Sequence, residues 1–119
     1  ATALTTATSK TIISLVLTEG DWDVDGVVDY LPAASTSITG LAQGASGTAN
    51  TLGADDTYAS DSITAIVAGA VAQRKPIPTQ RLSVPAAGTI AYLIANATFS
   101  ISTMTAYGTI RARRAKQLA

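Results

Sequence analysis

Apolar and polar residues alternate along most of this chain with a period of two, which is the side-chain repeat of a β-strand. The alternating segments are separated by clusters of Gly, Pro, Ser and Thr, and no stretch keeps a helical repeat for three turns. The pattern predicts an all-β chain, folded as a single-domain β-sandwich or jelly-roll-like fold of about seven or eight short antiparallel strands.

The expected strands follow from where the alternation begins and ends. They cover residues 11–19, 22–31, 35–41, 50–52, 80–84, 89–100 and 105–114. Residues 63–72 are rich in Ala and fit either a short helix or a strand, with the strand favoured. Residues 1–9 are expected to form an N-terminal arm or a peripheral strand, and residues 115–119 a short C-terminal tail, so that residues 1–119 make one β domain.

Local signals refine this picture. Both faces of residues 89–100 are apolar, which is typical of a central strand. Gly26 interrupts the alternation of residues 22–31 and predicts a bulge there. Pro76 and Pro78 exclude a central-strand position. The Gly-rich stretch around Gly44 and Gly47, residues 53–62 and residues 85–88 are expected to be loops or turns.

Composition narrows the function. The 119-residue chain has 47% hydrophobic residues but only 5% aromatic ones, and its 13% charged residues are about half the usual share. Cys and His are both absent, which removes thiolate nucleophiles, the common zinc sites and Ser-His-Asp catalysis. We therefore expect a protein that is not an enzyme and needs no cofactor. The apolar run Ile12–Leu17 is too short to span a bilayer, so no membrane association is expected.

Charge is segregated along the chain although the formal net charge is zero. All eight acidic residues lie between Glu19 and Asp61, and seven of the eight basic residues lie between Arg74 and Lys116. This segregation predicts self-association in which the acidic segment of one subunit contacts the basic C-terminal segment of the next. The expected interface residues are Asp21, Asp23, Asp25, Asp29, Arg111, Arg113 and Arg114.

One motif resembles a calcium loop. Asp21, Asp23 and Asp25 followed by Gly26 match its opening, but the twelfth position, where a bidentate Glu is required, is Pro32. The alternative is that the three Asp residues mark the solvent-facing or subunit-facing side of an edge strand. We favour this alternative and expect no metal site.

Other candidates are also weighed against plainer interpretations. The basic C-terminus has no interleaved aromatic residues, so a protein partner is favoured over nucleic acid. Asp55, Asp56 and Asp61 are carboxylates of the kind that glycosidases use, yet nothing in the sequence would raise one pKa. The acceptor sequence at Asn96 lies in the most buried expected strand, which favours a satisfied polar group over glycosylation.

Two segments of the chain, with a third between them, resemble small virion structural proteins of tailed bacteriophages. They are Gly20-Asp21-Trp22-Asp23-Val24 and Thr105-Ala106-Tyr107-Gly108-Thr109-Ile110-Arg111-Ala112-Arg113-Arg114, supported by Ile90-Ala91-Tyr92-Leu93-Ile94-Ala95 through Phe99. The likeness is to capsid decoration, or cement, proteins. It implies a non-enzymatic subunit, often trimeric, that binds the major capsid protein on the capsid exterior and stabilises the assembled head.

Two other functions remain open. A tail-fibre module would bind host carbohydrate through exposed aromatic residues, so clustering of Trp22, Tyr30 and Tyr58 on an open surface would favour it. A head-tail connector or tail-tube subunit would instead form rings of six or more copies.

Overall fold

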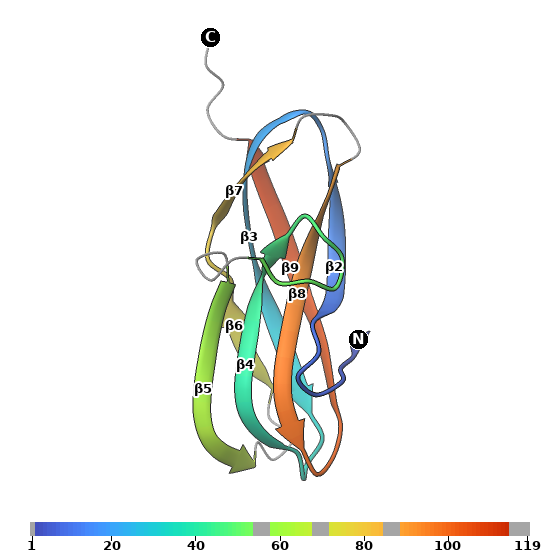
Figure 1. The fold of residues 1–119 in the computed structure, drawn as a ribbon, viewed down its shortest axis with the longest axis vertical. Coiled ribbons are helices and arrows are strands. Elements are labelled where there is room, and N and C mark those ends of the chain that lie inside the picture. Colours follow the sequence, from blue (N-terminus) through green and yellow to red (C-terminus); the bar gives the residue numbers. More distant parts are fainter. Residues whose placement is uncertain (1, 54–57, 68–71, 85–88, 115–119) are drawn as a thin grey trace.

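The computed structural model describes residues 2–53, 58–67, 72–84 and 89–114, which form nine β-strands and no helix (Figure 1). The strands are β1 (Thr2–Ala3), β2 (Lys10–Leu17), β3 (Gly20–Pro32), β4 (Ser37–Ser46), β5 (Tyr58–Val67), β6 (Gln73–Pro76), β7 (Gln80–Val84), β8 (Thr89–Ser100) and β9 (Met104–Arg114). The strands form two antiparallel sheets, which confirms the predicted all-β sandwich.

The first sheet, called the β3 sheet, is built on a long ladder between β3 and β9. Its register runs without a shift from Trp22 opposite Arg114 to Pro32 opposite Met104. On the other side of β3, β7 pairs with residues 20–24 and β6 with residues 27–30. The second sheet, called the β8 sheet, has the strand order β2-β8-β4-β5.

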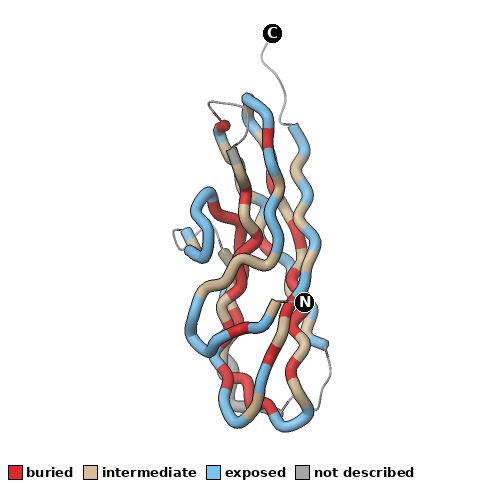
Figure 2. Tube along the Cα trace, turned by 90° about the vertical axis from the view of Figure 1, so that its right-hand side faces the viewer, coloured by how far each residue is buried: buried red, intermediate tan, exposed pale blue. Residues whose placement is uncertain are grey.

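Strand β8 is central, as predicted, and pairs with β2 on one side and β4 on the other. Its alternate residues Ala91, Leu93, Ala95 and Ala97 are buried in the core between the sheets. Ile94 on the opposite face is also fully buried. Small Ala side chains allow the two layers to pack closely, which explains why a chain with few aromatic residues still forms a core. Figure 2 shows buried residues along the strands of both layers.

The bulge predicted at Gly26 is wrong. The register between β3 and β9 continues through Gly26 opposite Ile110, and the even-numbered residues of β3 face inward on both sides of it. Glycine is needed here for a different reason, because a Cβ at Gly26 would collide with the carbonyl oxygen of Thr109. The glycine therefore marks a close approach of two backbones.

Several predicted boundaries in the middle of the chain are also wrong. The third strand continues to Ser46 and includes Gly44, whereas residues 50–52 form no strand. Residues 58–62, expected in a loop, begin β5, and the strand favoured for residues 63–72 is confirmed as far as Val67. Pairing of β4 on both sides, with β5 and β8, outweighs the low strand propensity of its glycines.

The segment at Pro76 and Pro78 lies at the edge of the β3 sheet, as expected, with β6 ending at Pro76 and β7 starting at Gln80. The turn predicted for residues 85–88, the tail at residues 115–119, and Asp55 and Asp56 lie outside the described residues.

Of the two alternatives for residues 1–9, the structure contains the peripheral strand. β1 pairs with β9, and the Leu4 N–H donates to the Met104 carbonyl oxygen at 3.0 Å. The Ala7 N–H then donates to the Ala97 carbonyl oxygen of β8 at 2.8 Å. This segment therefore connects the β3 sheet to the β8 sheet along one side of the sandwich.

Candidate functional site

The outer face of the β3 sheet carries a ladder of opposite charges. Asp21, Asp23, Asp25 and Asp29 occupy alternate positions of β3 and project to the same side. Arginines on the neighbouring strands face them from both flanks. This surface, called the charged face below, consists of Asp21, Asp23, Asp25, Asp29, Arg74, Arg81, Arg111 and Arg113.

Most of these charges are paired within the chain. Arg74 Nε donates to Asp29 Oδ1 at 2.7 Å, and Arg74 Nη2 donates to Asp29 Oδ2 at 3.3 Å. Arg81 Nε donates to Asp23 Oδ1 at 2.6 Å. Arg111 Nε lies 3.4 Å from Asp25 Oδ1. The acidic and basic halves of the sequence are thus brought together by the fold itself.

The pair at Asp29 is the most enclosed of these. The side chain of Asp29 is 11% exposed, whereas that of Arg74 is 73% exposed. The hydrogen bond from Arg74 and the charge of Asp29 raise the pKa of Arg74, and Asp23 raises the pKa of Arg81 in the same way. Because these guanidinium groups are open to water, the pairs mainly fix side-chain orientation and contribute little to stability.

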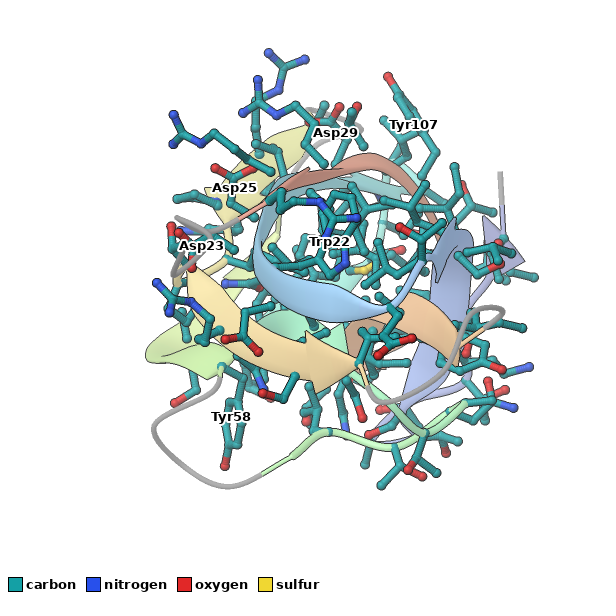
Figure 3. All side chains as sticks on the ribbon, turned by 90° about the horizontal axis from the view of Figure 1, so that it is seen from above. Trp22, Asp23, Asp25, Asp29, Tyr58 and Tyr107 are labelled. Carbon is teal, nitrogen blue, oxygen red and sulfur yellow. The ribbon has the colours of Figure 1, made fainter. Side chains whose placement is uncertain are left out.

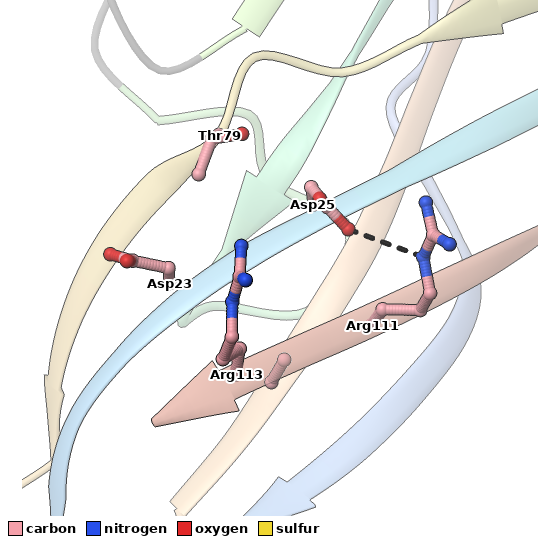
Figure 4. A pocket seen from close by; sticks show the side chains of 6 residues that line it. Asp23, Asp25, Thr79, Arg111 and Arg113 are labelled. Atoms are coloured by element: carbon pink, nitrogen blue, oxygen red, sulfur yellow. Dashed lines mark ion pairs between the residues drawn. The ribbon is translucent and has the colours of Figure 1, made fainter. Parts of the chain in front are cut away.

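Arg113 is different, since it makes no ion pair with any described residue although it lies opposite Asp23 in the ladder. It projects between Asp23 and Asp25 into a shallow pocket of about 370 Å³ (Figure 4). Thr79, Ala112 and Arg111 complete the lining. A guanidinium beside two carboxylates and a hydroxyl suits a charged side chain of a partner protein.

The structure places six of the seven predicted interface residues on the charged face. The exception is Arg114, whose guanidinium carbon lies 4.7 Å from the centre of the Trp22 ring. Arg114 also donates to the Glu19 carbonyl oxygen and to Thr18 Oγ1, each at 3.0 Å. It therefore anchors the turn between β2 and β3.

Sequence reasoning did not identify Arg74 and Arg81 as members of this surface. Their position depends on how the segment around Pro76 and Pro78 pairs with β3, and local sequence carries no signal for that register. The one signal in the sequence was charge, because Arg74 and Arg81 are opposite in charge to the aspartates of β3 and opposite charges favour pairing across strands.

The arrangement of the carboxylates does not suit a metal ion. Residues two apart on an extended strand are separated by roughly 7 Å, whereas calcium ligands must all lie about 2.4 Å from the ion. Asp21 accepts a hydrogen bond from Ser83 Oγ at 2.7 Å, and Asp23 and Asp25 face arginines. Among the described residues, no three metal-ligating side chains converge.

Trp22, Tyr30 and Tyr58 do not form a common surface. Tyr30 is fully buried in the core, and Trp22 packs partly against that core with its Nε1 donating to the Thr18 carbonyl oxygen at 2.8 Å. Tyr58 lies on β5 in the other sheet, and Figure 3 shows it far from Trp22. These three aromatic side chains therefore do not form the exposed cluster that would have favoured a sugar-stacking platform.

A second hollow lies on the outer face of the β8 sheet. This groove of about 270 Å³ is lined by Gly40, Leu41, Ala42, Leu52, Tyr58, Ser60, Asn96 and Thr98, none of which is charged. Asn96 Nδ2 donates to Ser9 Oγ at 3.1 Å, which confirms the interpretation of Asn96 as a satisfied polar group.

Comparison of the chain with models of known protein families, with curated proteins and with solved structures found no match. Within the described residues, no helix is long and apolar enough to cross a membrane.

Proposed function

We propose that this chain is a structural subunit of a tailed-bacteriophage virion that decorates the head on its exterior and stabilises the assembled lattice. The sequence resemblance suggests this class of protein, and the charged face is the observation that carries the proposal. Charges held by hydrogen bonds on a sheet suit docking onto a complementary protein surface, because little side-chain entropy is lost on binding.

The proposed mechanism is thermodynamic. A subunit that binds only the assembled lattice stabilises that lattice by mass action, and self-association adds avidity. The charged face contacts the major capsid protein, and Arg113, which has no ion-pair partner among the described residues, supplies a cation for an acidic side chain of that partner.

The test is co-sedimentation of the purified chain with assembled heads of the phage that carries its gene, in parallel with unassembled capsid protein. We expect binding to heads alone, weakened by Arg113→Glu and by raised salt. Ser100→Glu is the matched control, since Ser100 is exposed on the other sheet. Failure to bind heads, or equal binding to unassembled capsid protein, would contradict the proposal.

A second candidate function is binding of a neutral saccharide in the groove on the β8 sheet, as in a fibre module. The groove combines the Tyr58 ring with the amide of Asn96 and the hydroxyls of Ser60 and Thr98, groups that suit a neutral polyhydroxylated ligand. Screening against immobilised glycans tests it. Binding that Tyr58→Ala abolishes would support this function, and absence of binding to any glycan would reject it.

A further inference from the structure

Strand β2 forms one edge of the β8 sheet and is unusually apolar for an exposed edge. Lys10 starts the strand, residues 11–18 carry no charge, and Glu19 follows. In the described part of the chain, β2 pairs only with β8. Ile13 is 43% exposed and Val16 is 63% exposed, and they are two of the four large hydrophobic side chains found exposed among the described residues.

Soluble sandwiches usually protect such edges with charges, prolines or bulges. Protection of β2 is confined to its start, where the register shifts between Thr11 and Ile13. There the Thr11 N–H donates to Asn50 Oδ1 at 2.8 Å, and the Asn50 N–H donates to Thr11 Oγ1 at 2.9 Å. Residues 13–17 contain no proline and no charge, and among the described residues no strand other than β8 pairs with them.

We propose that β2 pairs in antiparallel orientation with β2 of a second copy of this chain. The contact joins two four-stranded β8 sheets into one continuous sheet of eight strands. A two-fold axis at Leu15 places Ile13 opposite Leu17 of the second copy, and Ser14 opposite Val16. In each pair the two residue numbers are both odd or both even. This is required because residues opposite each other must project from the same face of the joined sheet.

The two charges that flank β2 identify a second copy as the occupant. Lys10 and Glu19 form no ion pair with any described residue. In the antiparallel arrangement, the extra residue between Thr11 and Ile13 brings Lys10 of each copy level with Glu19 of the other, so the contact is complementary at both ends. A parallel arrangement would bring the two lysines together and the two glutamates together, which is unfavourable.

This contact differs from the acid-base interface expected from the sequence. It uses the edge of the β8 sheet, whereas the charged face lies on the other sheet. Figure 2 faces the side of the molecule on which β2 lies. Self-pairing through β2 leaves the charged face open for another protein, and it does not depend on the proposed function.

The first experiment measures self-association by sedimentation velocity over a concentration series. We expect a reversible dimer for the wild-type chain. The Kd of Val16→Lys should be at least about tenfold larger, because pairing of the two strands would remove water from the charged lysine side chain. Ser100→Lys places the same charge on an exposed position at the far end of the same sheet and should leave Kd unchanged. Circular dichroism and thermal melting verify that each variant folds.

A charge-swap experiment tests orientation. Lys10→Glu and Glu19→Lys should each weaken the dimer, and the double variant should restore it. Restoration inside one chain is excluded, since nine residues of extended chain separate the two sites by roughly 30 Å, about three Debye lengths at 0.1 M salt.

Three results would overturn the proposal. They are a wild-type chain that stays monomeric at every concentration, a Val16→Lys variant that associates like the wild type, and a double charge swap that does not recover. If the wild-type chain is monomeric and Val16→Lys loses binding to heads, the edge of β2 binds the capsid protein and not a second copy. If the wild-type chain forms dimers but does not bind heads, the proposed function is contradicted and the β2 contact is not.

Discussion

Tyr30 and Gln43 form a polar link across the core, and removing the Tyr30 hydroxyl should destabilise the fold. Tyr30 projects from β3, and its hydroxyl lies 2.9 Å from both the Ala42 carbonyl oxygen and Gln43 Oε1 on β4. Gln43 Nε2 in turn donates to the Pro76 carbonyl oxygen at 3.4 Å on the opposite sheet. Tyr30 and Gln43 are both almost fully buried, so water cannot replace a lost partner.

The magnitude follows from this burial. Tyr30→Phe keeps the ring and removes one proton that is shared by two acceptors, leaving Gln43 Oε1 without its donor. A buried acceptor left unpaired costs about 1 to 3 kcal/mol, so we expect a loss of about 2 kcal/mol in the free energy of unfolding. For a chain of 119 residues this corresponds to a fall in Tm of about 8 °C.

Urea unfolding of Tyr30→Phe, Gln43→Leu and the double variant measures the coupling. In Gln43→Leu the Tyr30 hydroxyl keeps the Ala42 carbonyl oxygen, so this change should cost less than Tyr30→Phe. The double variant should cost about 1 kcal/mol less than the sum, because no amide oxygen is left unpaired. A loss below about 0.5 kcal/mol in Tyr30→Phe, or strict additivity, would refute the link.

Three further predictions concern other parts of the fold. Gly108→Ala should cost about 1 to 3 kcal/mol in urea unfolding, because a Cβ there would lie 2.8 Å from Leu93 Cδ2 and would also press on the Val27 carbonyl oxygen; a neutral effect would contradict this close packing. Ile101, with φ of 78° and 79% exposure, is strained without burying its side chain, so Ile101→Gly should raise the free energy of unfolding by about 0.5 to 1 kcal/mol, whereas Ile101→Ala should bring no such gain. Calcium and chelators should leave Tm unchanged, and a calcium-dependent increase that Asp23→Asn removes would contradict the reading of residues 21–25 as an ion-paired strand.

The predictability of the strands depended on whether local pattern and tertiary pairing agreed. In β8 and β9 the local pattern and the pairing agree. Both sequences alternate and contain branched apolar side chains, β8 is paired on both sides, and β9 has a long ladder with β3. The predicted bounds of these two strands hold to within one residue. In β4 they conflict, because Gly44 predicts a loop while two flanking strands hold the backbone extended. Burial of paired backbone outweighs the weak preference of single residues.

The candidate site shows the same division. The Asp residues of β3 and Arg111 and Arg113 of β9 were recognisable as two charged strand faces from their spacing alone. That they would meet within one chain was not recognisable, and the sequence favoured a contact between subunits. Register decides which residue faces which across two strands, and a shift by one residue would turn every side chain to the other face.

The sequence by itself determined the strand-rich character of the chain, the faces of its clearest strands and the absence of His and Cys chemistry, because these depend on residue type and local periodicity. Only the tertiary structure decided that Asp23, Asp25 and Asp29 take arginines from three different strands, that Tyr30 links the two sheets, and that β2 is left at an edge. Those outcomes depend on long-range pairing, whose free energy is shared among segments far apart in the chain and leaves no signal within any one of them.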